Sequence, residues 1–219
     1  MRGQKTRVYI VDDHPLIRDG LVLLLGAEPD LAVCGCAGSL SEALKGIEKS
    51  SPDVVIIDIT LKDGSGLDLL PRLEGLAPGC KALIVSHHDE RLYGERALRA
   101  GAMGYVNKEE CDESILKAIR TVRDGKRFIS EQLMQRLVSA AIGQEDRTNE
   151  NPVERLTDRE LQVFTLIGQG VRTTEIARQL HLSRHTIDSH RENIRRKLDL
   201  KDGQELTHMA TRWKIEGEA

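Results

Sequence analysis

Five side chains that could bind a cation and a phosphate stand at the ends of short apolar runs in the first half of the chain. They are Asp12, Asp13, Asp58, Ser86 and Lys108. The run before Asp58, residues 54–57, is continuous and β-branched, which predicts a buried parallel strand. Because the carboxyl ends of parallel strands lie at one edge of a sheet, we expect the five side chains to converge there.

The chemistry of such a cluster follows from its charges. Carboxylates held close together repel one another unless a cation lies between them, and oxygen ligands of this kind favour Mg²⁺. One carboxylate could then attack a phosphorus centre and become an acyl phosphate, while the metal and a lysine neutralise the phosphoryl oxygens. Ser86 and Lys108 would each contact one of these oxygens. The alternative is that the acids are separate, solvated loop residues, but their matching positions at strand ends favour a common site.

Residues 7–124 alternate between runs typical of strands and periodicities typical of helices. We expect strands at 7–11, 31–36, 54–58, 82–86 and 104–107. We expect helices at Pro15–Ala27, Ser41–Lys49, Leu67–Leu76, Leu92–Ala100 and Asp112–Asp124. Five such units predict an α/β fold, a doubly wound parallel sheet with right-handed crossovers and helices on both faces.

The β signal stops after Gly125, and the rest of the chain is predicted to be all-α. Ser130 is a candidate N-cap for a helix at Glu131–Ile142. The apolar face of that helix is formed by Leu133, Leu137 and Ile142. The polar segment 143–153 contains a proline and lacks periodicity, so it is predicted to be an exposed linker.

The composition argues against a secreted or membrane protein. The net charge is −3, and the longest apolar stretch, Leu21–Leu25, is too short to cross a membrane. Nothing resembles a signal peptide, so we expect a cytoplasmic protein without a membrane partner. Cys34, Cys36, Cys80 and Cys111 lack the paired spacing of a metal site. We expect these cysteines to be reduced and packed rather than bound in a disulfide or to zinc.

The order of Asp12-Asp13, Asp58, Ser86 and Lys108 resembles the receiver domain of two-component response regulators. Residues 13–21 are similar to the opening of the NarL/FixJ branch of that family. The resemblance extends from residue 7 to about residue 124 and implies a flavodoxin-like (βα)5 receiver domain at 1–124. It also implies that Asp58 accepts a phosphoryl group from a sensor histidine kinase.

The resemblance assigns further roles around the acceptor. The implied Mg²⁺ ligands are Asp12 through water, Asp13, Asp58 and the backbone carbonyl of Thr60. Ser86 and Tyr105 would be the switch pair that changes rotamer on phosphorylation, although Tyr105 could also be an ordinary strand aromatic. The chain departs from the family where Leu61-Lys62 replaces the usual Met-Pro and where His87-His88 follows Ser86. We expect these departures to affect dephosphorylation and switching more than phosphorylation itself.

The last third of the chain has the pattern of a helix-turn-helix. A capping box from Thr157 to Glu160 predicts a helix that ends at Gly168 or Gly170. Further helices are expected at Thr174–His181, Arg184–Asp199 and Gly203–Trp213. The helix after the turn at Leu182-Ser183 has a buried stripe formed by Ile187, Ile194 and Leu198. Its opposite face is polar, which predicts a recognition helix for the major groove. A small structural bundle is the alternative.

Residues 156–198 carry a longer pattern, from Leu156-Thr157 through Glu175-Ile176-Ala177 to Lys197-Leu198, which resembles the LuxR-type DNA-binding domain. The resemblance covers about 155–213. It implies a four-helix domain at 155–219, joined to the receiver domain by a linker with a helix at 125–154. In such domains His190 packs rather than reads bases.

The expected DNA contacts lie along the recognition helix. They are Arg184, His185, Thr186, Asp188, Ser189, Arg191, Glu192, Arg195, Arg196 and Lys197. Positions 188, 189 and 192 would read bases, and Arg196 also lies opposite the buried stripe. Arg191, Arg195 and Lys197 lie at the sides, where phosphates would be. Asp188 and Glu192 stand where basic residues are common, but a glutamate can accept a hydrogen bond from the N4 amine of cytosine.

The sequence therefore predicts a DNA-binding response regulator rather than an enzyme. Phosphorylation at Asp58 would promote a homodimer and binding to double-stranded DNA, because paired half-sites double the contact set. One alternative is a receiver-like transcription factor that acts without phosphorylation. Another is a Mg²⁺-dependent aspartyl phosphohydrolase, which needs a second acid two residues after the nucleophile, where this chain has Thr60.

Overall fold

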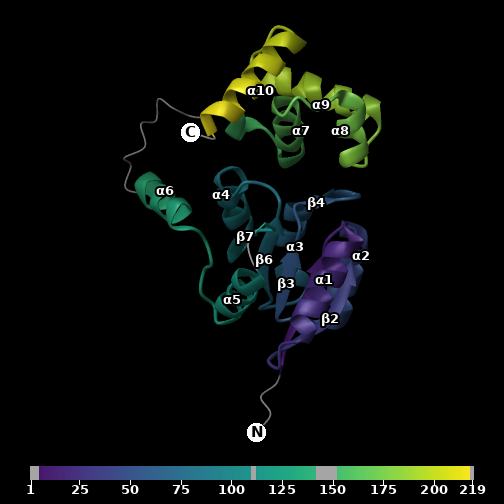
Figure 1. Cartoon of the computed structure of the whole chain (residues 1–219), viewed down its shortest axis with the longest axis vertical. Helices are drawn as coiled ribbons and strands as arrows, with labels where there is room; N and C mark the ends of the chain where they lie inside the picture. Colours follow the sequence, from purple (N-terminus) through teal and green to yellow (C-terminus); the bar gives the residue numbers. More distant parts are fainter. Residues whose placement is uncertain (1–4, 110–111, 142–151, 218–219) are drawn as a thin grey trace. The chain divides into compact units, whose positions relative to one another are not determined.

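The computed structural model describes residues 5–109, 112–141 and 152–217. The chain divides into two compact units, which we call the N-terminal unit, residues 1–145, and the C-terminal unit, residues 146–219. Each unit has its own core and is described by itself (Figure 1).

The N-terminal unit is built on a parallel five-stranded sheet with the order β2-β1-β3-β6-β7. Its strands are β1 Thr6–Val11, β2 Leu31–Ala37, β3 Val54–Ile57, β6 Lys81–Ser86 and β7 Gly104–Asn107. The predicted parallel sheet is confirmed, and all five predicted strands are present. Strand β3 stops one residue before Asp58, so the carboxylate lies just beyond the carboxyl end of the strand.

Helices cover both faces of this sheet. They are α1 Pro15–Gly26, α2 Leu40–Ser50, α3 Leu70–Leu76, α4 Glu90–Ala100 and α5 Asp112–Arg123. Apolar side chains of α1 and α5 share one core with the sheet, including Leu21, Leu25, Ile115 and Ile119. Helix α4 begins two residues before its predicted start because the side chain of Asp89 caps it by accepting from the backbone N–H of Arg91.

A short hairpin connects β3 to α3, and the sequence did not predict it. Strands β4 Thr60–Leu61 and β5 Gly64–Ser65 pair in antiparallel register. The 3-10 turn η1 Gly66–Leu69 then precedes α3, so the helix predicted at Leu67–Leu76 begins later than expected. A Cβ atom at Gly66 would collide with the backbone carbonyl oxygen of Asp58, so this position requires glycine.

Helix α6, Glu131–Ala141, packs against α4 within the N-terminal unit. Leu133 is 1 % exposed, and a Cβ atom at Gly94 of α4 would collide with its side chain. The backbone N–H of Ser130 donates to Glu90 at 3.1 Å, and Arg136 donates to the carbonyl of Arg91 at 2.9 Å. Of the predicted apolar face, Leu133 is buried, Leu137 is half-buried and Ile142 lies outside the described residues.

The predicted linker at 143–153 falls mostly outside the described residues, but its last two positions do not. Pro152–Arg155 form the 3-10 turn η3, and Val153 is only 3 % exposed. The assignment of Val153 to an exposed linker was therefore wrong. A single apolar residue in a polar segment gave too weak a signal to reveal that it is buried.

The C-terminal unit is all-α, as predicted. It contains α7 Asp158–Gly168, α8 Thr173–Gln179, α9 Arg184–Lys197 and α10 Gly203–Gly217. The capping box between Thr157 and Glu160 is present, with hydrogen bonds in both directions. Its core contains Leu161, Phe164, Ile176, Ile187, Ile194 and Leu206, and the ring of Phe164 meets Trp213 edge to face.

The described cysteines are free, but they are not equally packed. Cys34 and Cys80 are half-buried, and burial raises the pKa of the Cys80 thiol to about 12. Cys36 is exposed, contrary to the packed role that we expected, because β2 is the edge strand of the sheet. Cys111 lies outside the described residues. Among the helices of the described ranges, none has the length and apolar content needed to cross a bilayer.

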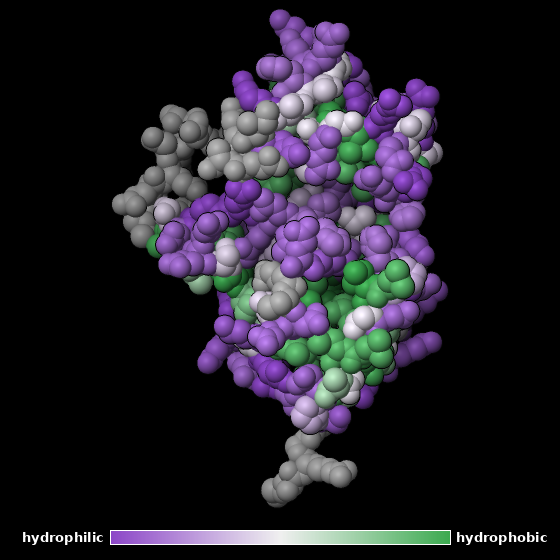
Figure 2. Space-filling view, in the orientation of Figure 1, coloured by the Kyte–Doolittle hydropathy of each residue, from purple (hydrophilic) through white to green (hydrophobic). Residues whose placement is uncertain are grey.

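Figure 2 shows one apolar region on the surface of the N-terminal unit, over α1. Leu16 is 85 % exposed and Leu23 is 76 % exposed, on the face of α1 that points away from the sheet. The same helix begins directly after Asp13 and His14, so this apolar surface starts beside the acidic cluster.

Candidate functional site

The carboxyl edge of the sheet brings together the acidic residues that the sequence singled out. Asp12, Asp13 and Asp58 are 2 %, 5 % and 3 % exposed. Candidate ligand atoms of these three residues and of His14 all lie within 4.8 Å of one another. The backbone N–H of Asp58 donates to the carbonyl of Val11 at 2.8 Å, which holds the acceptor next to the end of β1.

Ser86 and Lys108 contact the two carboxylate oxygens of Asp58 separately. The hydroxyl of Ser86 donates to Oδ1 at 2.7 Å, and Nζ of Lys108 donates to Oδ2 at 2.7 Å. Lys108 also reaches Oδ2 of Asp12 at 2.5 Å. The side chains from the ends of β1, β3, β6 and β7 therefore meet around one carboxylate, as the strand pattern predicted.

The electrostatics of the cluster suit a cation. Burial, and then the charge of Asp58, raise the pKa of Asp12, while Lys108 acts in the opposite direction. Burial alone would lower the pKa of Lys108, but Asp58 and Asp12 raise it above its usual value. Three buried carboxylates face one ammonium group, so negative charge is in excess. Oxygen donors with such an excess fit a hard divalent cation such as Mg²⁺.

His14 is a member of this cluster that sequence reasoning missed. Its Nδ1 lies 2.8 Å from Oδ1 of Asp13 and 3.4 Å from Oδ1 of Asp12. Its backbone N–H also donates to Oδ1 of Asp12 at 2.8 Å. The available signal was its place directly after Asp13 and before Pro15, which fixes it at the start of α1.

Tyr105 is buried beside the segment that follows Ser86. Its hydroxyl donates to the backbone carbonyl of His88 at 2.7 Å, and burial raises its pKa well above the usual value. The ring of His88 lies 4.6 Å from the ring of Tyr93 in α4, and its Nε2 is 2.9 Å from the hydroxyl of Thr60. His88 therefore connects the hairpin after the acceptor with β7 and α4.

A second candidate site is the exposed face of α9. The helix begins at Arg184 and is capped by Ser183, whose side chain accepts from the backbone N–H of Thr186 at 3.0 Å. Ile187, Ile194 and Leu198 are buried, as predicted. The exposed residues are Arg184, His185, Asp188, Ser189, Glu192 and Arg196, and the half-buried ones are Thr186, Arg191, Arg195 and Lys197. Burial lowers the pKa of His190, which favours the neutral, packed form.

Ion pairs along α9 modify the charge that it presents. Glu192 lies 3.2 Å from Arg195, and Asp188 lies 3.9 Å from Arg184, so both acids have basic neighbours. Nζ of Lys197 lies 2.6 Å from the buried carboxylate of Glu160 in α7. Sequence reasoning assigned Lys197 to DNA phosphates and did not find this partner, which lies 37 positions away.

Two family models match this chain. The response regulator receiver domain matches residues 8–120, and the luxR family of bacterial regulatory proteins matches residues 154–210. The oxygen regulatory protein NreC of Staphylococcus haemolyticus is 33 % identical over 213 residues, which cover 95 % of this chain and 98 % of that protein.

Solved structures agree with this relationship. A LuxR-family two-component response regulator from Aurantimonas sp. SI85-9A1 is 28 % identical, with a TM-score of 0.57 over 64 % of this chain and 99 % of that one. RcsB of Salmonella enterica, solved on the promoter rprA with the phosphomimetic BeF₃⁻, has a TM-score of 0.61 at 21 % identity, over 95 % of this chain and 99 % of that one. The latter likeness concerns the fold alone. The chain belongs to the two-component response regulators that join a receiver domain to a LuxR-type DNA-binding domain.

Proposed function

We propose that the chain is a transcription regulator in which Asp58 accepts a phosphoryl group from a sensor histidine kinase and thereby controls DNA binding. The observation that carries this proposal is the environment of Asp58. Ser86 and Lys108 hold its two oxygens at 2.7 Å, and the side chain is buried beside two further carboxylates. The same hydroxyl and ammonium group are suited to bind the oxygens of a transferred phosphoryl group.

The transfer breaks the bond between phosphorus and the histidine nitrogen of the kinase and forms a bond from phosphorus to a carboxylate oxygen of Asp58. The residues that would hold Mg²⁺ are Asp13, Asp58 and the backbone carbonyl of Thr60, with Asp12 acting through water. Mg²⁺ would supply charge neutralisation at the phosphoryl oxygens. The exposed Leu16 beside this edge supports a protein partner, because an apolar surface next to a reactive site favours docking of another protein.

A chain of contacts supports coupling between Asp58 and the rest of the molecule. Ser86 contacts Asp58, and the hydroxyl of Tyr105 holds the backbone of His88 between Ser86 and α4. Helix α4 in turn holds α6, through Gly94 under Leu133. We propose that rearrangement of Ser86 and Tyr105 on phosphorylation shifts α4 and changes how α6 docks. Phosphorylation would then promote a homodimer and DNA binding in the cytoplasm.

In the C-terminal unit we propose that α9 enters the major groove. Its exposed polar face lies opposite the buried stripe, which is the arrangement of a recognition helix. Asp188, Ser189 and Glu192 would read base edges, and the arginines at the sides would contact phosphates. The neighbouring arginines reduce the repulsion between the two acids and the DNA backbone. The RcsB complex on a promoter supports this use of the shared fold.

Acyl phosphate formation is the test of the acceptor. The full-length chain is incubated with phosphoramidate, with and without Mg²⁺, and the phosphorylated residue is identified by mass spectrometry. We expect Mg²⁺-dependent phosphate on Asp58 and none on the Asp58→Asn variant. The Asp53→Asn variant, changed at an exposed aspartate before β3, is the matched control and should be phosphorylated normally. Equal labelling of Asp58→Asn would place the acceptor elsewhere.

Two further measurements separate the alternatives. A Mg²⁺-dependent phosphohydrolase would release phosphate from a small phosphomonoester in steady state, and we expect negligible turnover because Thr60 replaces the second acid. A receiver-like factor that acts without phosphorylation would show the same DNA affinity whether or not Asp58 carries phosphate.

A further inference from the structure

The hairpin that follows the acceptor is fastened at its tip to a helix far away in sequence. Oδ1 of Asp63 accepts from the backbone N–H of Leu40 at 2.6 Å, and Oδ2 accepts from the backbone N–H of Ser41 at 3.0 Å. These are the first two residues of α2, and they precede Asp63 by 23 and 22 positions. A single carboxylate therefore fastens the acceptor hairpin to α2.

The physical basis of this contact is the unpaired start of a helix. The first N–H groups of a helix have no partner within it, and they carry partial positive charge that favours an anion. In α2 the side chain of the N-cap Ser39 accepts from the backbone N–H of Glu42, and the N–H groups of the first two helical residues are bound by Asp63. Burial acts to raise the pKa of Asp63, but these hydrogen bonds lower it below its usual value.

The base of the same hairpin carries a residue of the acceptor site. Thr60 pairs with Ser65 and Leu61 with Gly64, so the tip and the base form one unit. The hydroxyl of Thr60 is 2.9 Å from Nε2 of His88, which holds the base on its other side. With Asp63 bound to α2, the hairpin is held from two directions. Its remaining freedom of movement at Thr60 is therefore small.

We propose that Asp63 is a positioning residue for the acceptor site: by capping α2 it fixes the hairpin, and with it the backbone carbonyl of Thr60 that would ligate Mg²⁺. This inference rests on the proposed function. Removal of the cap lets the hairpin move, so the carbonyl leaves its place and the affinity for the cation falls. The chemistry at Asp58 itself is unaffected once the cation is bound, because Ser86 ends β6 and Lys108 directly follows β7, so neither belongs to the hairpin.

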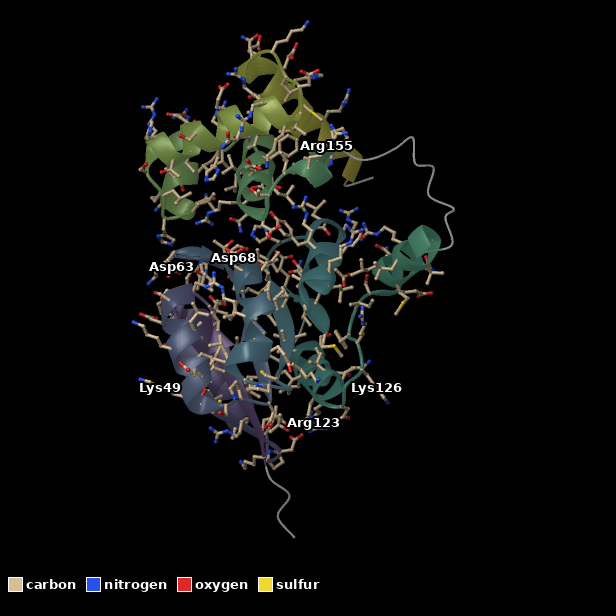
Figure 3. The ribbon with its side chains drawn as sticks, turned by 180° about the vertical axis from the view of Figure 1, so that it is seen from behind. Lys49, Asp63, Asp68, Arg123, Lys126 and Arg155 are labelled. Atoms are coloured by element: carbon tan, nitrogen blue, oxygen red, sulfur yellow. The ribbon has the colours of Figure 1, made fainter. Side chains whose placement is uncertain are left out.

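The chain offers a matched control in Asp68, an exposed aspartate on η1 in the same connection between β3 and α3 (Figure 3). It makes none of the capping hydrogen bonds. The Asp68 variants therefore remove the same charge from the same segment without releasing the hairpin. Four full-length variants are compared with the native chain: Asp63→Ala, Asp63→Asn, Asp68→Ala and Asp68→Asn. Asparagine at 63 keeps one acceptor oxygen for α2, whereas alanine keeps none.

The dissociation constant of Mg²⁺ alone is measured by calorimetry for each variant. We expect it to rise about tenfold in Asp63→Ala, the lower end of the effect of residues that orient metal ligands. Asp63→Asn should fall between Asp63→Ala and the native chain. Both Asp68 variants should stay within about twofold of the native value, because a distant exposed charge is largely screened. At saturating Mg²⁺ the rate of phosphorylation by phosphoramidate should be equal in all five proteins.

Thermal unfolding shows whether the variants remain folded, and amide exchange at Leu40 and Ser41 shows whether the cap is lost. A native-like Mg²⁺ affinity in a folded Asp63→Ala protein overturns the positioning role but leaves the acceptor assignment intact. An equal loss in the Asp68 variants also overturns it, since charge alone would then explain the effect. Failure of the native chain to bind Mg²⁺ overturns the proposed function and this inference together.

Discussion

The N-terminal unit buries the charges of its functional site, whereas the C-terminal unit keeps most of its own at the surface. Asp12, Asp13 and Asp58 are each at most 5 % exposed, and their balance depends on Lys108. On α9, Glu192 and Arg195 form an ion pair that is partly exposed, so water screens the attraction between their charges. Buried charge is costly unless it is paired, whereas surface pairs contribute little to stability. Loss of a single charged side chain should therefore destabilise the N-terminal unit at the acidic cluster. Loss of a charged side chain on the exposed face of α9 should leave the C-terminal unit folded and change its affinity for DNA.

The largest effect is expected from Lys108→Met. It leaves buried carboxylates without their ammonium partner, so the free energy of unfolding of the N-terminal unit should fall by about 3–5 kcal/mol without Mg²⁺. Urea unfolding measures the change, and added Mg²⁺ should restore part of it. Lys62→Met, on the exposed tip of the hairpin, is the control and should be close to neutral. A native stability for Lys108→Met would show that the ammonium does not balance the acids.

Glu160→Gln tests a buried carboxylate of the C-terminal unit, which pairs with Lys197 of α9. It removes the partner of Lys197 and weakens the capping box, so we expect a loss of about 1–3 kcal/mol in the stability of that unit. Glu175→Gln, which breaks an exposed pair with Arg178, should change little. Equal losses in the two variants would contradict the distinction between buried and exposed charge.

The same pair predicts a pH dependence. Burial acts to raise the pKa of Glu160, but the hydrogen bonds from Lys197 and Thr157 lower it. A lowered pKa means that the stabilisation is complete above the pKa of the unfolded chain and is lost as the pH falls through the pKa of the folded chain. The difference in stability between the native chain and Glu160→Gln should therefore shrink on acidification below about pH 4.5. A difference in stability that grows in that pH range would show that folding raises the pKa of Glu160 instead of lowering it.

Glu192→Gln should alter which sequence is preferred. We expect the discrimination between bases at one base pair to change by about 1–3 kcal/mol. The reason is that the neutral amide would no longer accept the same hydrogen bond from the N4 amine of cytosine. Non-specific affinity should rise, since a negative charge leaves the phosphate field. Selection of preferred duplexes from a random pool gives the test. A uniform shift in affinity with the same preferred sequence would show that Glu192 is not a reader.

Arg191→Ala and Lys197→Ala should differ from one another, although both remove a basic side chain from α9. Arg191→Ala should weaken binding to all sequences and lower the slope of log affinity against log salt by about one. Lys197→Ala should lower the slope less, because Glu160 already engages its ammonium group, and should lower the stability of the unit instead. Equal slopes would mean that Lys197 leaves Glu160 when DNA binds.

The sequence was most informative where a local pattern determines the position of a side chain. Strand-like apolar runs predicted where β1, β3, β6 and β7 end, so it was possible to predict that Asp58, Ser86 and Lys108 would meet. The capping box and the stripe of Ile187, Ile194 and Leu198 predicted α7 and the buried face of α9 in the same way.

Contacts between distant segments could not be predicted from such patterns. The hairpin strands β4 and β5 are two residues long, too short for any periodicity, and the hairpin is held by Asp63 and Thr60 through tertiary hydrogen bonds. The partner of Lys197 lies in another helix, and the side chain of Leu133 packs closely over Gly94 in α4. Each of these features depends on two elements that only the folded chain brings together.

In the proposed function, phosphorylation of Asp58 in the N-terminal unit controls DNA binding by the C-terminal unit. The most direct measurement is the affinity of the full-length chain for a duplex selected from a random pool, with and without beryllofluoride and Mg²⁺. We predict that beryllofluoride tightens binding by about tenfold or more for the native chain, within the usual range of coupling between two sites, and leaves Asp58→Asn unchanged. Equal affinity of the native chain in both conditions, with Asp58 shown to be modified, would contradict the account.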